Sequence, residues 1–318
     1  MQSPTTSREA ASVEVVIGSL EKIFRDAEIA ARSSEAVLIL GETGVGKEVL
    51  ARYIHERSRR HARPFLPINC AAIPAHLLES ELFGYERGAF TGATQSRKGL
   101  LEEAEGGTVF LDEVVEIPLD AQAKLLRAIE AKQIRPLGST RYRPIDVRFI
   151  AATNADIKRK VERGEFRRDL YYRLSIFVYV IPPIRERPQD IPALVHHFLA
   201  EAGISVRLTP ATWELLFCYP WPGNIRELKN ALTCALARMD GEELRPEHLP
   251  DVILARCPRP DVLRETDLRK KLACFEAQLL ADALQRSSDL SEVARELGIG
   301  LRTLYRKLKR YGLTKPGS

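Results

Sequence analysis

Near the start of the chain, a short apolar run passes directly into a glycine-rich loop and then into a helical pattern. The run at residues 37–40 is β-branched and short, as a buried parallel strand would be, and apolar residues at helical spacing resume from Val49. Backbone N–H groups in such a loop can close around phosphate oxygens at a helix N-terminus, so this order of elements predicts a phosphate-binding loop. The residues of the loop are Gly41, Glu42, Thr43, Gly44, Val45, Gly46, Lys47 and Glu48.

Two side chains at the end of this loop bear on what it can bind. Lys47 supplies a point charge toward the β- and γ-phosphates of a nucleotide. The general motif continues with Ser or Thr, which holds Mg²⁺, whereas this chain has Glu48. Taken alone, that departure weakens the prediction of a nucleotide site.

A second apolar strand pattern, at residues 106–111, ends in the carboxylates Asp112 and Glu113. An acid at a strand end beside a phosphate loop can hold Mg²⁺ directly or through water, and its neighbour can accept a proton from an attacking water. We assign Asp112 to the metal and Glu113 to the water. Two solvated acids at a strand end are the usual alternative for a single Asp-Glu pair, and the phosphate loop upstream disfavours it.

Strand patterns at residues 65–68, 147–152 and 177–181 alternate with helical ones. With the two strands above, they predict an α/β fold in which a parallel five-stranded sheet is covered by helices on both faces. Polar residues follow two of these strands, where ligands gather, and are placed to sense a γ-phosphate or to steer Glu113. Ordinary loop-capping roles are equally open for them. These residues are Asn69, Thr153 and Asn154.

The strand patterns stop after two prolines at 182 and 183. We expect a disordered lead-in at residues 1–12, an α/β unit at 13–183, a helical unit without strands at 184–252, a linker at 253–264 and a C-terminal unit at 265–318. A Gly-Ser turn between residues 134 and 144 predicts a β-hairpin. The five cysteines are scattered and odd in number, which predicts reduced packing residues. The polar N-terminus and the lack of a long apolar run predict a cytoplasmic chain.

All of the excess positive charge lies at the C-terminal end. From Arg264 onward there are 12 Lys and Arg against 7 Asp and Glu, and the preceding residues hold 36 of each kind. Two helical patterns flank a glycine-containing break at 298–300, which predicts a helix-turn-helix. If Leu301, Leu304 and Leu308 pack inward, the second helix can face a DNA major groove with its other residues. A solvated basic helix is the alternative. The candidate DNA contacts are Arg302, Thr303, Tyr305, Arg306, Lys307 and Arg310.

Residues 88–93, GAFTGA, have neither a helical nor a strand period and predict a loop. Such a loop either tucks the ring of Phe90 into its own domain or offers it to a partner. On its own, the segment favours the buried ring.

Taken in order, GETGVGKE, GAFTGA, GGTVFLDE, FRRDLYYRL, WPGNIRELKN and the helix-turn-helix resemble a bacterial enhancer-binding protein, an AAA+ activator of RNA polymerase carrying sigma-54 with a Fis-type helix-turn-helix. The resemblance covers roughly residues 15–314, and GAFTGA is diagnostic of the family. It implies an AAA+ P-loop NTPase fold with a helical lid, ATP and Mg²⁺ as cofactors, and ATP hydrolysis. Glu is usual after the phosphate-loop lysine in that family, which removes the difficulty with Glu48.

The resemblance also implies roles for single residues. Asn69 matches the residue that holds the strand-end glutamate inactive until the nucleotide state changes, and Thr153-Asn154 match the sensor I segment. Ile17-Gly18 match the segment that lines the adenine site. The hairpin matches the pre-sensor I insertion. The loop that contacts sigma-54 corresponds to Gly88, Ala89, Phe90, Thr91, Gly92 and Ala93.

Three arginines match family residues that act on nucleotide. Arg226 matches sensor II on the lid, and Arg167 and Arg173 match arginines that reach the nucleotide of a neighbouring subunit. Hydrolysis should therefore require a ring, in this family generally a hexamer, and DNA should be bound by a dimer at paired half-sites.

The expected function is ATP-driven remodelling of closed complexes of sigma-54 RNA polymerase by an activator bound to enhancer DNA. Most members begin with a regulatory domain, whereas here the AAA+ module starts at about residue 13, so we expect control by a trans-acting protein, by expression level or by self-assembly. The alternative is a DNA-binding regulator or repressor that keeps the AAA+ fold only for oligomerisation. An AAA+ loader for replication or proteolysis would leave the helix-turn-helix unexplained.

Overall fold

The computed structural model describes residues 18–90 and 92–256 and, except for positions 278, 282, 285 and 288, residues 276–313. The chain forms two compact units. The α/β unit comprises residues 23–42 and 46–181, and the helical unit comprises the described part of residues 1–22, 43–45 and 182–318. The domain limits expected from the sequence stay predictions.

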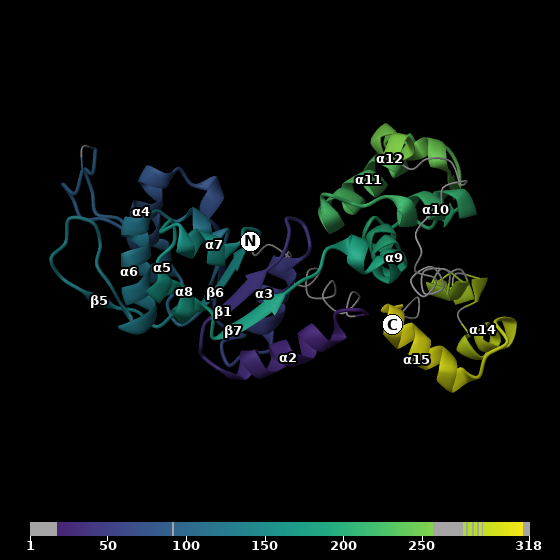
Figure 1. The fold of residues 1–318 in the computed structure, drawn as a ribbon, viewed down its shortest axis with the longest axis horizontal. Coiled ribbons are helices and arrows are strands. Elements are labelled where there is room, and N and C mark those ends of the chain that lie inside the picture. Colours follow the sequence, from purple (N-terminus) through teal and green to yellow (C-terminus); the bar gives the residue numbers. More distant parts are fainter. Residues whose placement is uncertain are drawn as a thin grey trace, which may run out of the picture. The chain divides into compact units, whose positions relative to one another are not determined.

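Strands and helices alternate along the α/β unit (Figure 1). Its strands are β1 (Val37–Leu40), β2 (Phe65–Asn69), β3 (Thr108–Asp112), β4 (Gln133–Ile134), β5 (Arg143–Pro144), β6 (Arg148–Thr153) and β7 (Phe177–Val180). Its α-helices are α2 (Glu21–Arg32), α3 (Lys47–Glu56), α4 (Ala75–Phe83), α5 (Leu100–Glu103), α6 (Leu119–Glu130), α7 (Ile157–Glu162) and α8 (Arg168–Leu174). Short 3₁₀ turns are η2 (Cys70–Ala72) and η3 (Val114–Glu116).

The main sheet is parallel, with strand order β2-β3-β6-β1-β7, which confirms the predicted five-stranded sheet. Leu40 at the end of β1 lies opposite Thr153 of β6, and Asn69 of β2 lies opposite Asp112 of β3. The carboxyl ends of parallel strands share one edge of a sheet. These residues therefore lie at the same edge as the loop that follows β1. The predicted hairpin is also present, as the antiparallel pair β4–β5.

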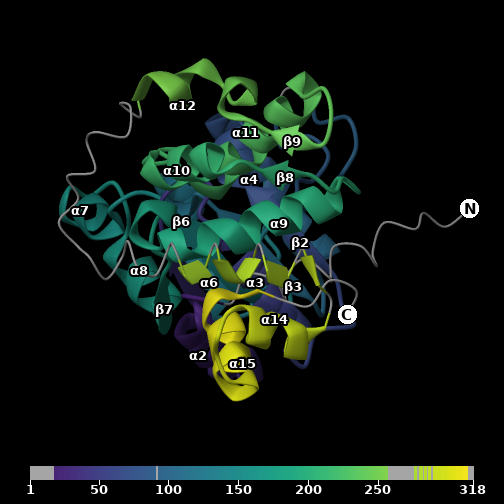
Figure 2. The same ribbon diagram turned by 90° about the vertical axis from the view of Figure 1, so that its right-hand side faces the viewer.

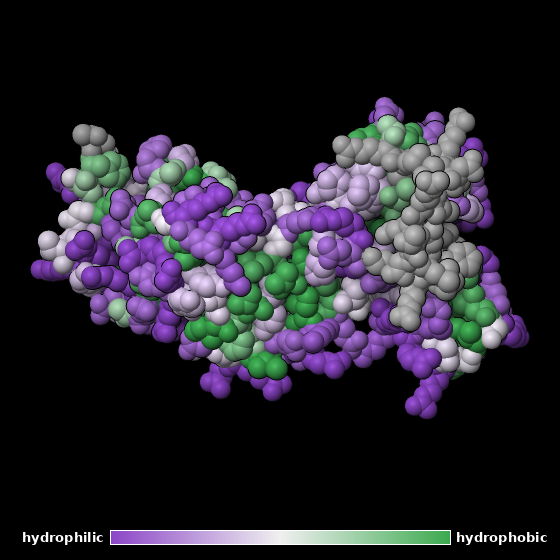
Figure 3. All heavy atoms as spheres, in the orientation of Figure 1, coloured by the Kyte–Doolittle hydropathy of each residue, from purple (hydrophilic) through white to green (hydrophobic). Residues whose placement is uncertain are grey.

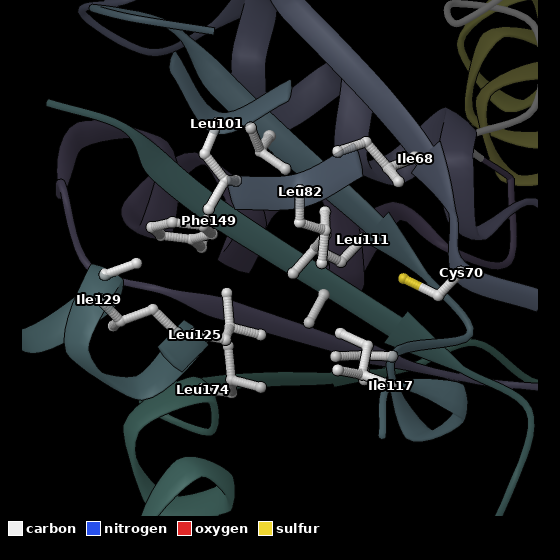
Figure 4. Packing of buried hydrophobic residues seen from close by; sticks show 14 of the residues in the cluster. Ile68, Cys70, Leu82, Leu101, Leu111, Ile117, Leu125, Ile129, Phe149 and Leu174 are labelled. Carbon is white, nitrogen blue, oxygen red and sulfur yellow. The ribbon is translucent and has the colours of Figure 1, made fainter. Parts of the chain in front are cut away.

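One face of the sheet packs against α4, α5, α6 and α8 in a continuous hydrophobic core (Figure 4). Successive side chains of a strand point to opposite faces, so β3 and β6 contribute alternate residues to this core, including Leu111 and Phe149. Figure 4 shows Leu82 of α4 and Leu125 of α6 packed against them. The core anchors the strand end that carries Asp112.

The described cysteines are free, and they differ in burial. Cys70 lies in this core, as predicted, and burial together with the charges of Asp112 and Glu113 raises the pKa of its thiol to about 12. Cys218 is exposed at the end of α10 (Pro210–Cys218), because that helix buries its opposite side, so the expected packing role is wrong there. Cys257 and Cys274 lie outside the described residues.

α2 and α3 cover the other face of the sheet. Phe24 of α2 meets Tyr53 of α3 edge to face, with ring centroids 4.7 Å apart. The buried Arg148 of β6 donates hydrogen bonds to the carbonyls of Ala30 and Ala31 at the end of α2. The last carbonyls of a helix have no partner within it, so this guanidinium satisfies the Ala31 carbonyl. It is a second donor to the Ala30 carbonyl, which also accepts a hydrogen bond from the Ser33 N–H.

Among its described residues, the helical unit contains three short 3₁₀ turns, six α-helices and two two-residue strands. Figure 2 shows these helices. Its helices are α9 (Ile191–Glu201), α10, α11 (Asn224–Arg238), α12 (Asp251–Arg256), α14 (Leu290–Glu296) and α15 (Leu301–Tyr311). Its 3₁₀ turns are η4 (Ile184–Glu186), η5 (Pro188–Asp190) and η6 (Pro246–His248).

The expectation of a strand-free segment after residue 183 is wrong in one detail. β8 (Arg207–Leu208) and β9 (Glu243–Leu244) form a short parallel pair. Thr209 and Thr212, which begin α10, are tied to it, because the Thr212 hydroxyl donates to the carbonyl of Leu244. Two residues are too few to show an alternating pattern in a sequence.

Figure 3 shows hydrophobic residues, drawn in green, over the edge strand β7. Ile176, Val178 and Val180 are 42%, 44% and 61% exposed. An exposed apolar edge strand is typical of a surface that another chain covers. In the described part of the chain, no helix has both the length and the apolar character needed to cross a membrane.

Candidate functional site

The phosphate loop leaves β1 and enters α3 with its lysine folded against the loop. The Lys47 ammonium donates to the carbonyls of Gly41 and Glu42, at 2.9 and 3.3 Å. α3 begins at Lys47 after Gly46, whose φ of 104° lies in the left-handed region, and no side chain caps the helix. The first N–H groups of α3 and the dipole of the helix are thus left for an anion.

Glu113 is held from two sides at the carboxyl edge of the sheet. Its Oε1 lies 3.4 Å from the Lys47 Nζ, and its Oε2 accepts hydrogen bonds from the Thr153 hydroxyl at 3.2 Å and the Asn154 N–H at 3.0 Å. Its φ is 52°, which is uncommon for a residue with a side chain. The structure therefore brings together four of the predicted site residues.

Asp112 lies beside this group and is half-buried. Its Oδ1 accepts a hydrogen bond from the Glu113 N–H at 3.1 Å. Burial, with the charge of Glu113, raises the pKa of Asp112, while the charge of Lys47 opposes the rise. A second positive charge at this carboxylate would favour its ionised form.

Mg²⁺ and a nucleotide fit the donors at this edge. Carboxylate oxygens are ligands that Mg²⁺ prefers, and it is commonly held by one or two of them together with substrate phosphates and water. The described residues contain no cluster of three or more His, Cys, Asp or Glu side chains suited to a metal. Asp112 would hold the ion, and Glu48 is engaged elsewhere, 3.3 Å from Arg52.

The middle of the phosphate loop belongs to the helical unit. Thr43, Gly44 and Val45 cluster with that unit, and their carbonyls accept hydrogen bonds from it. Gly18 is the first described residue of the predicted adenine segment, and a Cβ there would approach the Asp190 Oδ1 to 3.1 Å. Ile17 lies outside the described residues.

Asn69 has a local role in the structure. Its Oδ1 accepts hydrogen bonds from the N–H groups of Ala71 and Ala72, at 3.0 and 3.2 Å, and so caps η2. The contacts of Glu113 come from Lys47, Thr153 and Asn154 instead. The control of Glu113 by Asn69 stays a prediction.

The three predicted nucleotide-binding arginines lie at separate places. Arg167 directly precedes α8, and its guanidinium is paired at 2.7 Å with Asp169 in the first turn of that helix. Arg173 lines a cavity of about 80 Å³ with Ser34 and Lys132, at the sheet edge where β1 begins, opposite to the edge of Lys47. Its Nε is buried and has no hydrogen-bond partner among the described residues. Arg226, which the resemblance assigns to sensor II, lies exposed in the first turn of α11, and the roles of all three arginines stay predictions.

The GAFTGA loop connects α4 to α5 and is tied to the hairpin. The Glu86 N–H donates to the carbonyl of Leu137, and the Leu137 N–H donates to Gly84, both at 2.9 Å. A Cβ at Gly138 would lie 2.9 Å from the Cβ of Ala89, so the hairpin turn touches the loop. Arg143 of β5 adds ion pairs to Glu86 and to Glu102.

The tip of this loop presents its aromatic ring. Phe90 is 43% exposed and contacts Tyr85 with ring centroids 5.0 Å apart, so the buried position that the segment alone favours is wrong. Gly88 and Gly92 have φ of 84° and 104°, and a Cβ at either would have open space around it. Thr91 lies outside the described residues.

In the helix-turn-helix, α15 packs through Leu304, Leu308 and Tyr311, and Leu301 is 41% exposed, so its predicted packing role is wrong. Lys307 also differs from the prediction, because its ammonium pairs with Glu276. That carboxylate also accepts a hydrogen bond from Tyr311. The remaining candidate DNA contacts are exposed or half-exposed: Arg302, Thr303, Tyr305, Arg306 and Arg310.

Sequence reasoning missed two buried residues that contact the phosphate loop, Arg187 and Asn224. Asn224 lies in the WPGNIRELKN motif, where attention went to Arg226. A charged residue shortly after two prolines gives no signal of burial, because its ion-pair partner Asp190 is apparent only in the fold.

Three family models match successive parts of the chain. They describe the sigma-54 interaction domain at residues 16–179, the AAA+ ATPase lid domain at residues 185–265, and the Fis family of bacterial regulatory proteins at residues 271–311. The first alone covers more than half of the chain.

The chain is also similar to individual curated proteins over most of its length. The chain is 46% identical over 309 residues to a protein named limonene hydroxylase from Geobacillus stearothermophilus, covering 93% of this chain and 56% of that one. It is 46% identical over 299 residues to the phenol regulator MopR of Acinetobacter guillouiae, covering 89% and 53%. It thus spans about half the length of these curated relatives.

A solved structure of NtrX from Brucella abortus in complex with ATP is similar over nearly the whole chain. The TM-score is 0.71 at 33% identity, and the match covers 96% of this chain and 71% of that one. Together with the phosphate loop, the Asp112–Glu113 pair and the GAFTGA loop, these matches show that the chain belongs to the family of sigma-54-dependent transcriptional activators.

Proposed function

We propose that this chain hydrolyses ATP and uses the cycle to remodel closed complexes of sigma-54 RNA polymerase at promoters near the DNA that it binds. The observation that carries the proposal is the position of the Glu113 carboxylate, between the phosphate-loop Lys47 and the Thr153–Asn154 segment. A carboxylate held on one side by two hydrogen bonds, and on the other by the Lys47 ammonium at 3.4 Å, suits a general base.

ATP with Mg²⁺ supplies the phosphoanhydride that is cleaved and the cation that neutralises its charge. Lys47 can exchange the carbonyls of Gly41 and Glu42 for phosphate oxygens, because all three of its contacts are hydrogen bonds that an anion can replace. Glu113 then keeps its bonds to Thr153 and Asn154, and its Oε1 is left to accept a proton from water.

The exposed Phe90 supports a partner contact by the GAFTGA loop. The hairpin holds the base of the loop through Leu137 and Gly138, while the tip has space on all sides of its glycines. A tip of this kind can change position without disturbing the core. We assign it to sigma-54, in line with the family.

α15 supports the DNA contact, and Arg167 and Arg173 support self-association into a ring. Arg302, Arg306 and Arg310 repeat every four residues on α15, so they share one face of that helix. Arg173 lies at the sheet edge opposite to Lys47, so it can serve only the nucleotide of another copy.

The test is a reconstituted promoter-opening assay with sigma-54 polymerase, enhancer DNA and the full chain, with and without ATP. We expect open complexes only with ATP. If promoter complexes stay closed with ATP, although the polymerase is competent and the DNA has been shown to bind the chain, the proposal is wrong.

A variant of the loop separates coupling from hydrolysis. Phe90→Ala should leave the rate of ATP turnover within about twofold of the wild type, because the exposed ring of Phe90 contacts Tyr85, and the contacts of Glu113 come from Lys47, Thr153 and Asn154. It should abolish promoter opening. Leu77→Ala is the matched control, since Leu77 on α4 is 41% exposed and should tolerate truncation. If Phe90→Ala opens promoters normally, the loop is not the coupling element. The same comparison with Thr91→Ala tests the other half of the motif.

A further inference from the structure

Three consecutive carbonyl groups of the phosphate loop accept hydrogen bonds from the helical unit, to which residues 43–45 belong. The Thr43 carbonyl accepts from the Asn224 Nδ2 at 3.1 Å, and the Gly44 carbonyl accepts from the Ile225 N–H at 3.0 Å. The Val45 carbonyl accepts from the Arg187 Nη2 at 3.0 Å. All three donors therefore act on adjacent peptide groups.

These contacts set the direction of the N–H groups in the same peptides. In a planar trans peptide, the C=O of one residue and the N–H of the next point in opposite directions. Fixing the carbonyls of Thr43, Gly44 and Val45 therefore turns the N–H groups of residues 44, 45 and 46 away from their donors. No described residue accepts a hydrogen bond from these three N–H groups. They are the groups that a phosphate-binding loop offers to its ligand.

Asn224 is held rigidly at this contact. It is fully buried, its φ is 54°, and its Oδ1 accepts a hydrogen bond from the Ile184 N–H at 2.9 Å. The amide is thus oriented by a donor on one side and the Thr43 carbonyl on the other. The fit is close, because a Cβ at Gly44, whose φ is 80°, would lie 2.4 Å from the carbonyl oxygen of Gly223. Only glycine can occupy that position without a shift of the backbone.

Arg187 joins the loop to two further segments of the helical unit. Its guanidinium donates to the Pro182 carbonyl at 3.1 Å and pairs with Asp190 at 3.2 Å, and both charged side chains are buried. Asp190 in turn accepts hydrogen bonds from the N–H and hydroxyl of Ser19. A buried guanidinium whose three nitrogens each donate to a partner is oriented by its surroundings and holds the Val45 carbonyl in place.

We propose that Asn224 and Arg187 are positioning residues for the phosphate loop, which they hold with its N–H groups turned toward the ligand. The consequence for nucleotide binding rests on the proposed ATPase function. Nucleotide phosphates would bind the N–H groups of the loop, while Asn224 and Arg187 bind its carbonyls. Both interactions stabilise the same loop conformation. Nucleotide binding and the carbonyl contacts therefore favour each other to the same degree.

The experiment uses the full chain and two variants with matched controls. Asn224→Asp keeps an acceptor for the Ile184 N–H but turns a carboxylate oxygen toward the Thr43 carbonyl, and Asp tolerates the left-handed region. Its control is Asn230→Asp, the same change at an exposed position of α11. Arg187→Lys keeps the charge beside Asp190 but lacks the second arm of the guanidinium. Its control is Arg185→Lys, at an exposed position of η4.

The first measurement is the Kd for ADP by calorimetric titration. Asn224→Asp and Arg187→Lys should each weaken ADP binding about tenfold, as the loss of one buried hydrogen bond predicts, and the two controls should match the wild type. Folded variants that bind ADP as tightly as the wild type would overturn the positioning role.

The second measurement is independent of nucleotide binding. The Ile225 N–H lies in the first turn of α11, where a helix offers it no acceptor, so its hydrogen exchange reports its bond to the Gly44 carbonyl. Arg187→Lys should speed this exchange about tenfold, and Arg185→Lys should leave it unchanged. If the wild type binds no ADP, the proposed function fails. The exchange of the Ile225 N–H still decides in that case whether its bond to the Gly44 carbonyl depends on Arg187.

The wild type provides a measurement that needs no variant. ADP should slow the exchange of the Ile225 N–H, because occupied N–H groups and occupied carbonyls stabilise the same loop. If ADP binds and the exchange of Ile225 does not change, the coupling is wrong, even where both variants fail to fold.

Discussion

At the scale of single residues, Glu113 combines an unusual backbone conformation with three hydrogen-bonding partners. Residues in sparsely populated φ/ψ regions persist where the surrounding structure holds them, and they gather at functional sites. Here the left-handed φ turns the side chain from β3 toward Lys47 and Thr153. Burial and the charge of Glu113 raise the pKa of its neighbour Asp112.

Replacing Glu113 with Gln should lower the kcat of ATP hydrolysis at least about a hundredfold and change the Kd for ATP by less than about threefold. The amide keeps an oxygen for Thr153 and the Asn154 N–H but cannot accept the proton of water. Phosphate release and nucleotide titration measure the two effects. Glu116→Gln, at an exposed acid of η3, should match the wild type. Normal turnover in the Glu113 variant would rule out its role as the base.

At the scale of the element, α15 separates its two faces clearly. Leu304, Leu308 and Tyr311 are buried, while Arg302 and Arg306 are exposed on the other side. Lys307 lies between the faces, and its pairing lowers the pKa of Glu276 against the opposing effect of burial. The helix therefore has exposed arginines on one side and one lysine that pairs with a carboxylate of the same unit.

Arg306→Ala should weaken binding to enhancer DNA and leave ATP turnover unchanged. If Arg306 contacts a phosphate, the variant should also reduce the dependence of log K on log salt by about one, because one fewer counterion is released. Fluorescence anisotropy at several salt concentrations measures both quantities. Glu292→Ala, at an exposed position of α14, serves as the control. Equal loss of DNA binding and ATP turnover would mean that Arg306 supports the structure.

α9 contains a buried titratable group, His196, which packs against the ring of Trp213. Burial lowers the pKa of His196 to about 4. In the unfolded chain the pKa of this histidine is near 6.5. Between pH 6.5 and 4 the unfolded chain therefore binds more protons than the folded chain, so the free energy of unfolding should fall as the pH drops through this window. The difference corresponds to about 3 kcal/mol at most.

Urea unfolding at pH 7.5 and at pH 5 tests this contribution. His196→Phe, which keeps a ring beside Trp213, should lose less stability on acidification than the wild type. His76→Phe, at an exposed position of α4, should follow the wild-type dependence. If the His196 variant and the wild type lose the same free energy of unfolding between pH 7.5 and pH 5, another group causes the acid sensitivity.

At the scale of the whole molecule, Arg173 and the phosphate loop lie at opposite edges of one sheet. A single copy of the chain cannot bring them together, and the exposed apolar strand β7 is suited to contact with a second copy. Both features support the proposed self-association.

Mixing two inactive variants tests the supply of Arg173 by a neighbour. Lys47→Ala should lose ATP binding, and Arg173→Ala should keep ATP binding and lose at least about a hundredfold in kcat. Their mixture should hydrolyse ATP faster than the sum of the two, because Lys47→Ala copies supply Arg173 to intact loops. Arg168→Ala, at an exposed position of the same helix, is the control for Arg173. A mixture no faster than the sum would contradict the exchange.

Much of the fold could be predicted from local patterns. The central strands β1, β3 and β6 appear in the sequence as largely apolar runs, because burial on both faces favours apolar residues. The short strands β8 and β9, the exposure of Leu301 and the pairing of Lys307 could not be predicted. Each of these depends on which surface another part of the chain happens to cover.

The sequence by itself determined the order of strand, glycine-rich loop and helix, the acidic pair at Asp112 and Glu113, and the loop that carries Phe90. These are properties of consecutive residues, since periodicity and glycine content act within a few positions. Only the tertiary structure decided that Glu113 would meet Thr153, and that Asn224 and Arg187 would hold the carbonyls of the phosphate loop. Those contacts join residues far apart in the chain, and they depend on the register of parallel strands and on where buried polar groups find partners.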